Sequence, residues 1–268
     1  MAPPGRRSIS LPSSRDVRVK PPPFDYRAPI SVDEVCALLG SLEDAKVLAG
    51  GQSLVPLLNF RLARPQYIVD INRVVGLDRI YERDGGIAVG ALARQAGVED
   101  SELVARICPL LPQALRLVAH RVIRNRGTVC GSLAHADPAS ELPAVLLALG
   151  GHVVARSTRG ERVIPAAALF KGVFDTALAP DELMVEAWFP ATSGDFAIAE
   201  ESRRHGDFAL AGVVLASGRL ALFGVAPTPV LVDRRDPTRG LAPSGDLEAT
   251  PEFRLHLVKV LTERVLAA

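Results

Sequence analysis

The sequence predicts an α+β fold, and three observations support this prediction. Apolar residues recur at helical spacing in some segments, most clearly at 255–266, and form short runs with strand character in others, such as 183–189. Short turn sequences join several of the predicted strands into hairpins. The order of helices and strands lacks the strict βαβ rhythm of a doubly wound parallel sheet. We therefore expect helices and sheets that are mixed along the chain.

The predicted elements begin near residue 24. Residues 1–19 are rich in Pro, Ser and Arg and have no apolar period, so we expect a disordered extension there. Ser31 is the predicted N-cap of the first helix, Glu34 is its capping-box partner, and Gly40 ends the helix. The next expected elements are a strand at 46–49, a helix at 54–62, a strand at 67–71, and a hairpin of 80–81 and 87–89.

The second half of the chain continues the same mixture. A helical region at 102–117 should be broken by Pro109 and Pro112. The remaining expected elements are a helix at 142–149, a hairpin of 153–156 and 162–164, a strand at 183–189, a hairpin of 209–215 and 220–224, and an amphipathic helix at 255–266. We find no internal repeat.

The composition excludes several classes of function. The 268 residues carry 31 Lys+Arg and 30 Asp+Glu, and a net charge of +1 argues against a nucleic-acid partner bound through bulk charge. No apolar run approaches the ~18–20 residues of a transmembrane helix. Cys36, Cys108 and Cys130 lie far apart, without the spacing of a zinc site or an iron–sulfur cluster. We therefore expect a cytoplasmic protein with no metal site.

Two glycine-containing segments carry the chemical signal. The first reads Lys46-Val47-Leu48-Ala49-Gly50-Gly51-Gln52-Ser53-Leu54. A strand would lead into Gly50 and Gly51, which lack Cβ atoms and let the backbone approach a ligand closely or adopt positive φ. Successive amides in such a turn form a concave site that suits a diphosphate. The alternative is a tight turn between strand and helix, which is the commoner origin of an isolated Gly-Gly pair.

The second segment reads Arg124-Asn125-Arg126-Gly127-Thr128-Val129-Cys130-Gly131-Ser132-Leu133-Ala134-His135-Ala136-Asp137-Pro138. It contains the acid Asp137, and a further acid, Glu141, follows it. These acids could accept hydrogen bonds from ribose hydroxyls or an adenine amine. The alternative is a polar loop in which Asp137 or Ser140 caps the helix at 142–149. Two such segments together suit a ligand with two phosphates better than either suits one alone. Neither has the glycine spacing of a Rossmann site or of an ATPase phosphate loop.

The same region gives no support for catalysis by side chains or by a metal. Ser132, His135 and Asp137 lie within one short stretch, whereas catalytic triads converge from distant segments. His135, Asp137 and Glu141 lack a second His at ligand spacing. The Cys130 thiol has no evident His partner and is better explained as a small turn residue. We therefore predict no catalytic residue and no metal ligand.

Five long stretches match the motifs of one family in the same order. They are AGGQSLVPLLNFRLARPQYIVDI at 49–71, IRNRGTVCGSLAHADPASELPAVLLAL at 123–149, FKGVFDTALAPDELMVEAWFP at 170–190, RRHGDFALAGV at 203–213 and GVAPTPV at 224–230. In these stretches the chain resembles the FAD-binding medium subunit of molybdenum hydroxylases, of the carbon monoxide dehydrogenase type. The same flavin domain is found within xanthine dehydrogenases.

The resemblance implies a two-lobed FAD-binding domain at 20–190, with lobes at 20–75 and 76–190, and a small C-terminal α/β domain at 191–268. The C-terminal domain looks shortened between 230 and 251. FAD would lie extended between the lobes. The resemblance places its ligands on Lys46–Leu54, on Thr128–Ser132 within the second segment, on Asp137 and Glu141, and on the backbone near Val185.

Three positions depart from the family pattern. Cys130 stands where many relatives have Gly, so a close approach of backbone and flavin there is in doubt. Glu141 stands where Asp is common, and Ala199 replaces a Lys of the xanthine dehydrogenase branch. That lysine contact is therefore not carried over to this chain.

The implied function is electron transfer. In the family, a large subunit oxidises substrate at a molybdenum cofactor, and a small subunit passes the electrons through iron–sulfur clusters to FAD. The flavin then reduces an external acceptor. The resemblance thus implies FAD as the cofactor and these two subunits as partners. It also implies a dimer of heterotrimers in the cytoplasm, and it leaves open a peripheral position at the inner face of the membrane. The alternatives are a stand-alone flavin-dependent reductase of the same fold, or an assembly subunit without redox turnover.

Overall fold

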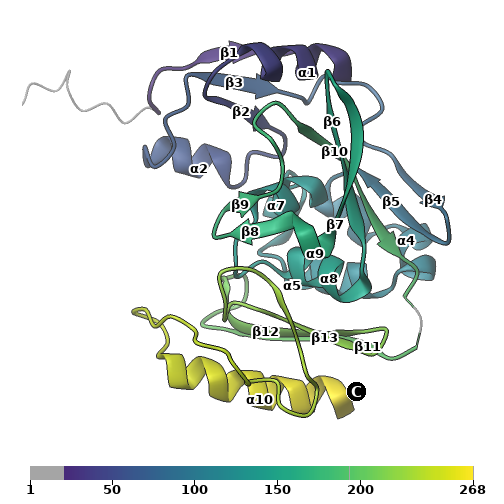
Figure 1. Ribbon diagram of the computed structural model, residues 1–268, viewed down its shortest axis with the longest axis vertical. Coiled ribbons are helices and arrows are strands. Elements are labelled where there is room, and N and C mark those ends of the chain that lie inside the picture. Colours follow the sequence, from purple (N-terminus) through teal and green to yellow (C-terminus); the bar gives the residue numbers. More distant parts are fainter. Residues whose placement is uncertain (1–20, 193, 268) are drawn as a thin grey trace, which may run out of the picture.

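The computed structural model describes residues 21–192 and 194–267, which form three tiers (Figure 1). The predicted extension at 1–19 lies outside these residues. The first tier is a parallel sheet in the order β1-β3-β2. Its elements are β1 (Asp25–Arg27), α1 (Val32–Ser41), β2 (Ala45–Leu48), α2 (Leu54–Asn59) and β3 (Tyr67–Asp70). Helix α2 lies on the side of this sheet that faces the second tier.

The second tier is an antiparallel sheet of five strands in the order β4-β5-β10-β6-β7, together with most of the short helices. The strands are β4 (Ile80–Arg83), β5 (Gly86–Gly90), β6 (His152–Ser157), β7 (Gly160–Pro165) and β10 (Leu183–Pro190). The helices are α3 (Gln95–Glu99), α4 (Glu102–Ile107), α5 (Leu110–Leu117), α6 (Arg121–Arg124), α7 (Val129–His135), α8 (Glu141–Leu149) and α9 (Ala166–Leu169). A small hairpin of β8 (Phe170–Gly172) and β9 (Asp175–Thr176) follows α9.

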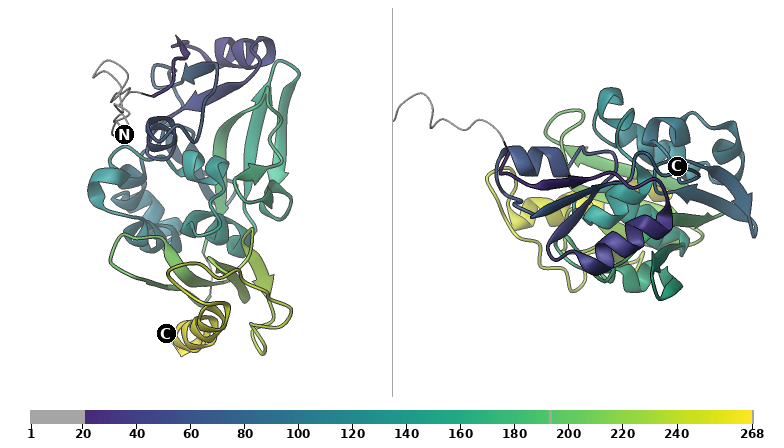
Figure 2. Two further views of the ribbon diagram at one scale, coloured as in Figure 1. Left: turned by 90° about the vertical axis from the view of Figure 1, so that its left-hand side faces the viewer. Right: turned by 90° about the horizontal axis from the view of Figure 1, so that it is seen from above.

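The third tier is an antiparallel sheet in the order β11-β12-β13-β14, with one long helix. Its elements are β11 (Phe196–Ser202), β12 (Ala209–Ala216), β13 (Arg219–Phe223), β14 (Val230–Val232) and α10 (Pro251–Ala267). Helix α10 packs against β11 and β12 on one face of the sheet, while α8 packs against β12 and β13. Because both faces are covered, every residue of β12 is buried. Figure 2 shows α10 at the end of the molecule opposite to the first tier.

Helix α8 joins the second and third tiers. All nine of its residues are buried, which explains why its sequence is apolar on every side. Its C-cap, Gly150, has a φ of +75°, the left-handed conformation in which glycine ends a helix without steric cost. The main core of the second tier, which includes α8, therefore also contains residues of β12 and β13.

The α+β prediction is confirmed. All four predicted hairpin and strand regions after residue 79 form, and the chain breaks between α4 and α5 at Pro109, as expected. Pro112, by contrast, lies inside the first turn of α5, where a missing N–H costs no helical hydrogen bond.

The helix ends differ slightly from the predictions. Helix α1 continues one residue past Gly40, and α10 begins four residues before the predicted 255. At the start of α1, Ser31 Oγ accepts a hydrogen bond from the Glu34 amide, as predicted. The Glu34 carboxylate instead accepts from the amide of Ile30, one residue earlier than a capping box requires.

The packing between β12 and β13 predicts a sensitive position at Gly212. A Cβ at Gly212 would lie 2.0 Å from Cζ of Phe223, whose ring is fully buried. We expect Gly212→Ala to lower the free energy of unfolding by about 1–3 kcal/mol, because the ring has no room to move. Urea unfolding measures this change.

Gly40→Ala is the matched control, since no atom lies within 4 Å of a Cβ built at Gly40 in α1. It should leave stability unchanged or raise it by up to ~1 kcal/mol. Equal effects of the two substitutions would contradict this account of the sheet packing.

Candidate functional site

The two glycine segments meet at Gly50. A Cβ on Gly50 would lie 2.4 Å from the carbonyl oxygen of Arg126 and 2.8 Å from Cα of Gly127. These obstacles are backbone atoms, so a side chain at position 50 cannot be accommodated by a simple rotation. Gly50 is therefore required because the first tier contacts the second tier there. Gly50 does not adopt the positive φ that the sequence analysis allowed for it, whereas its approach to a ligand stays a prediction.

A cavity of about 300 Å³ opens beside this contact. It is lined by Leu48, Ala49, Gly50, Gly51, Gln52, Val55, Pro56, Asp70, Asn72 and Arg126. Gly51 has a φ of +76°, as the sequence predicted for this turn. Within the described ranges, the amides of Gly50, Gly51 and Gln52 donate to no protein acceptor. The turn thus presents unpaired N–H donors, which is the property expected of an anion site.

The walls of the cavity carry one positive and one negative charge, and the positive one suits an anionic ligand. The guanidinium group of Arg126 is exposed and forms no hydrogen bond or ion pair with any residue that the structure describes. On the other wall, burial alone would raise the pKa of Asp70, but hydrogen bonds from Tyr26 and Asn72 outweigh it and hold this pKa below its ordinary value. Asp70 is therefore ionised, and its oxygens already have donors.

The second glycine segment is not a loop, which corrects the sequence prediction. Thr128 is the N-cap of α7, and its Oγ1 accepts a hydrogen bond of 3.0 Å from the Gly131 amide. Residues 129–132 therefore form the first turn of a helix. The structure differs from the predicted loop because a Thr before small residues can cap a helix as readily as it can form part of a turn.

The side chain of Cys130 points into the core. It is almost fully buried, and its Sγ donates to the carbonyl oxygen of Val89 at 3.5 Å. Burial raises the pKa of the Cys130 thiol above its ordinary value, so the sulfur stays protonated. The departure from the family pattern at this position is thus accommodated by the core beneath α7.

The other predicted ligands lie outside the cavity. Of the first segment, Lys46, Val47, Ser53 and Leu54 do not line it, although Leu48–Gln52 do. Thr128–Ser132, Asp137, Glu141 and Val185 do not line it either.

Two of these residues have local structural roles. Asp137 Oδ1 accepts from the Ala139 amide at 2.9 Å and so shapes the turn before α8. Val185 lies at a β-bulge between β10 and β6, and its carbonyl oxygen accepts from the Ala91 amide at 2.9 Å. Whether they contact a cofactor stays a prediction.

Two acids, the buried Glu141 and the partly buried Glu200, lie between the second and third tiers. Glu141 is 8% exposed at the start of α8, and Glu200 lies in β11. Burial, reinforced by the charge of Glu200, raises the pKa of Glu141 to about 8. Burial also raises the pKa of Glu200 to about 7, and its Oε2 has no hydrogen-bond partner among the described residues. Both carboxyls are therefore protonated more readily than an exposed glutamate.

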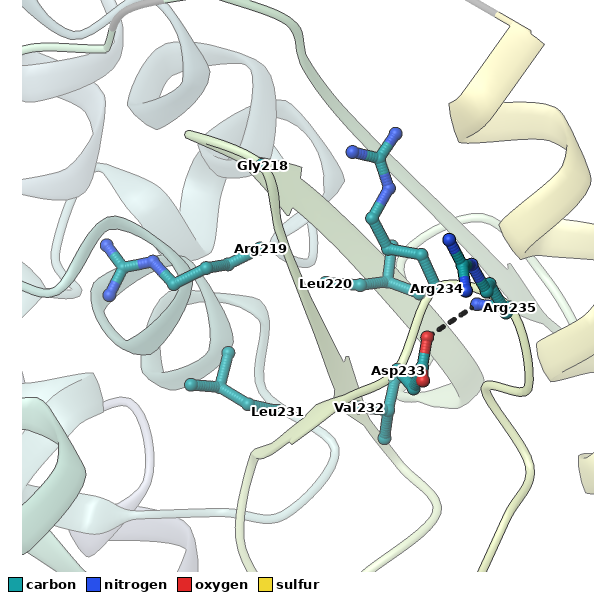
Figure 3. Close-up of a pocket in the computed structure, with 8 residues that line it drawn as sticks. All are labelled: Gly218, Arg219, Leu220, Leu231, Val232, Asp233, Arg234 and Arg235. Atoms are coloured by element: carbon teal, nitrogen blue, oxygen red, sulfur yellow. Dashed lines mark hydrogen bonds between the residues drawn. The ribbon is translucent and has the colours of Figure 1, made fainter.

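A larger groove, of about 540 Å³, lies on the third tier and is separate from the glycine segments (Figure 3). It is lined by residues of β13, β14 and the turn after β14, including Arg219, Arg234 and Arg235. Figure 3 shows the Arg219 and Arg234 side chains extending away from each other. Because these guanidinium groups diverge, the groove lacks the convergent donors that a bound anion requires.

Sequence reasoning missed the polar residues that surround the glycine turn. Asp70 is the last residue of β3, and Asn72 follows shortly after it. Arg94 directly precedes α3. Polar residues just after a buried strand were the available signal for Asp70 and Asn72. Arg94 carried no such signal, whereas Arg126 lies within the family stretch at 123–149 but was not singled out.

Residues 21–192 and 194–267 show neither a membrane-spanning helix nor a metal site. No helix there is long and apolar enough to cross a membrane. The same residues contain no group of three or more His, Cys, Asp or Glu side chains placed to hold a metal ion.

An α+β fold with unpaired amides at a glycine turn among the described residues is what a domain that binds an anionic nucleotide would present. Residues 22–192 match the family described as FAD binding domain in molybdopterin dehydrogenase, and the chain belongs to this family. The FAD cofactor inferred from the sequence is thereby confirmed.

Relatives of known function agree with this assignment. The 6-hydroxypseudooxynicotine dehydrogenase complex subunit alpha of Paenarthrobacter nicotinovorans is 40% identical over 93% of this chain and 95% of its own. The carbon monoxide dehydrogenase medium chain of Hydrogenophaga pseudoflava is 41% identical over 78% of this chain and 77% of its own. The chain is thus an oxidoreductase flavoprotein subunit.

A solved structure shows the same fold. It is that of carbon monoxide dehydrogenase from Hydrogenophaga pseudoflava which lacks the Mo-pyranopterin moiety of the molybdenum cofactor. It superposes with a TM-score of 0.89 at 34% identity, and the match covers 92% of this chain and 97% of that one. The predicted resemblance to medium subunits is confirmed, whereas the domain boundaries and the shortening near 230–251 stay predictions.

The buried acid pair predicts how stability depends on pH. Both folded-state pKa values, about 8 and about 7, lie above the ordinary value of 4.5. The pair therefore contributes most to the free energy of unfolding when the pH is below the ordinary pKa of glutamate. This contribution is lost as the pH rises through the two folded-state pKa values. We expect the free energy of unfolding, measured in urea between about pH 5 and pH 9, to fall with pH and to fall less in Glu141→Gln. Parallel curves for the two proteins would contradict this assignment.

Proposed function

We propose that this chain is the electron-transfer subunit of a molybdenum hydroxylase complex, in which it passes electrons from iron–sulfur clusters through FAD to an external acceptor. The observation that carries the proposal is the preformed turn at Gly50 and Gly51, with its unpaired amides and the free guanidinium group of Arg126. Relatives named as a complex subunit and as a medium chain support a role within an assembly of different chains.

The residues of the cavity fit one part of FAD in particular. Amides in a left-handed turn and a nearby Arg are complementary to the oxygens of a diphosphate. The amides of Gly51 and Gln52 would donate to these oxygens, and Arg126 would neutralise their charge. The cavity holds only a part of so large a cofactor, so the rest of FAD would extend beyond it. Thr128–Ser132, Asp137, Glu141 and Val185 stay the predicted ligands of that remainder.

The bound flavin would supply reversible acceptance of electrons, and the protein would supply position and charge. We propose a large molybdenum-cofactor subunit and a small iron–sulfur subunit as partners, in a cytoplasmic dimer of heterotrimers. Exposed apolar side chains offer contact surfaces for these partners: Val55, Phe60 and Leu62 around α2, and Val173 and Phe174 between β8 and β9. Such side chains on a surface are typical of interfaces between proteins.

The proposal is tested by the redox behaviour of the purified chain. The protein should be yellow and should release FAD, not FMN, on denaturation. Dithionite should reduce the flavin, but an organic substrate should reduce it only after the large and small subunits are added. Turnover of an organic substrate by the chain alone with NADH would favour a stand-alone reductase. A folded, FAD-binding chain that its partners cannot reduce would favour an assembly subunit.

The turn itself gives a second prediction. Gly51→Val should weaken FAD binding, since a β-branched residue at a φ of +76° is strained and its Cβ would crowd Leu48 and Val55 at 3.2 Å. A strain of ~1–2 kcal/mol corresponds to a loss of affinity of about tenfold. Fluorescence titration with FAD measures it. Gly97→Val is the control, because a Cβ on Gly97 in α3 meets no atom within 4 Å. Equal affinities of Gly51→Val and Gly97→Val for FAD would show that the cofactor does not bind at this turn.

A further inference from the structure

Two side chains, those of Arg94 and Asn72, connect the two glycine segments beside the cavity. Arg94 Nη1 donates to the carbonyl oxygen of Arg126 at 2.7 Å, and Arg94 Nη2 donates to Asn72 Oδ1 at 2.6 Å. The amide nitrogen of the Asn72 side chain donates in turn to the carbonyl oxygen of Ala49 at 2.9 Å. Hydrogen bonds thus run without interruption from the turn that begins at Ala49 to the turn at Arg126.

Asn72 is itself held in one orientation. Its backbone amide donates to Asp70 Oδ1 at 2.9 Å, and its Nδ2 donates to the same oxygen at 2.6 Å. The hydroxyl of Tyr26 donates to the other oxygen of Asp70. The oxygen of the Asn72 amide is therefore fixed toward Arg94, and the first tier presents a rigid acceptor to it.

The backbone next to Arg94 also pairs with the second segment. The amide of Gln95 donates to the carbonyl oxygen of Gly127 at 2.8 Å, and Arg94 forms an isolated β-bridge with Thr128. The side chain of Arg94 and the backbone of Arg94 and Gln95 therefore all contact residues 126–128 of the second tier. A Cβ on Gly127 would lie 2.5 Å from the Gln95 side chain, which shows how closely the two segments approach.

The charge of Arg94 is poorly compensated. Among the described residues it has no carboxylate in ion-pair contact, and its donors face a carbonyl and an amide oxygen. Burial, followed by the nearby charge of Arg126, lowers the pKa of Arg94 below its ordinary value. A partly buried guanidinium group of this kind is suited to a geometric role, because its planar fork reaches two acceptors in fixed directions.

We propose that Arg94 is the positioning residue of the cofactor cleft, because its fork fixes the distance between the turn at 49–52 and the segment at 126–128. This inference rests on the proposed function, namely that FAD occupies the cleft. Arg94 acts through Ala49 and Arg126 and is not assigned any contact with the cofactor. The cleft would thereby be set to its binding shape before FAD arrives, which reduces the cost of ordering on binding.

A purely electrostatic role for Arg94 makes a different prediction, and Arg94→Lys separates the two. Lysine keeps the positive charge, but its single ammonium group cannot reproduce the planar fork between Asn72 and Arg126. If position matters, Arg94→Lys should bind FAD nearly as weakly as Arg94→Met. If charge alone matters, Arg94→Lys should bind FAD as the unaltered protein does.

The experiment compares the full-length apoprotein with Arg94→Lys, Arg94→Met and the control Arg116→Met. Arg116 is exposed on α5 and has no partner among the described residues. We expect the Kd for FAD to rise by about tenfold or more in both Arg94 variants, since a hydrogen bond to a charged group contributes ~1.5–3 kcal/mol. Arg116→Met should stay within about twofold of the unaltered protein.

A second readout needs no cofactor. Amide hydrogen exchange of the apoprotein should speed up at 49–52 and at 126–128 in both Arg94 variants, while α8 and β12 keep their protection. Unchanged exchange at these two segments, or an unchanged Kd in Arg94→Lys, would overturn the inference. Exchange that speeds up equally throughout the chain would also overturn it, because Arg94 would then stabilise the whole fold. If the unaltered protein fails to bind FAD, the proposed function fails instead, and the exchange measurement still tests the link between the segments.

Discussion

The contact between Gly50 and the backbone of Arg126 and Gly127 sets the geometry of the site. Only a hydrogen atom fits in this space, so the first tier lies against the second as closely as a residue without a side chain allows. The turn at Gly51 and the cavity beside it exist because of this approach. The unpaired amides of the turn and the charge of Arg126 then face the same space, which neither tier could create alone.

The rest of the fold holds these tiers in place. Helix α8 is buried on all sides between the second and third tiers, and α10 covers the outer face of the third. This arrangement places the acids Glu141 and Glu200 where water cannot reach them freely, which explains their raised pKa values. A carboxyl that is neutral near neutral pH can donate a hydrogen bond as well as accept one.

Local patterns predicted much of the fold but less of the site. The hairpins and the apolar run of α8 were evident because their periodicity and turns are encoded within a few residues. The capping of α7 by Thr128 was missed, since the same small residues are common in loops and in first helical turns. The roles of Asn72, Arg94 and Arg126 were not predictable, because the hydrogen bonds that join them arise only when two tiers pack together. Gly50 was singled out correctly, but its neighbour is the backbone of Arg126, which sequence spacing could not reveal.

The central claim is that the diphosphate of FAD lies at the turn of Gly50 and Gly51, beside Arg126. A crystal structure of the protein isolated with its flavin tests it most directly. The account predicts diphosphate oxygens within about 3 Å of the amides of Gly51 and Gln52 and of the Arg126 guanidinium group. A diphosphate bound elsewhere, for example in the groove between β13 and β14, or an adenine ring in the cavity in its place, would contradict it.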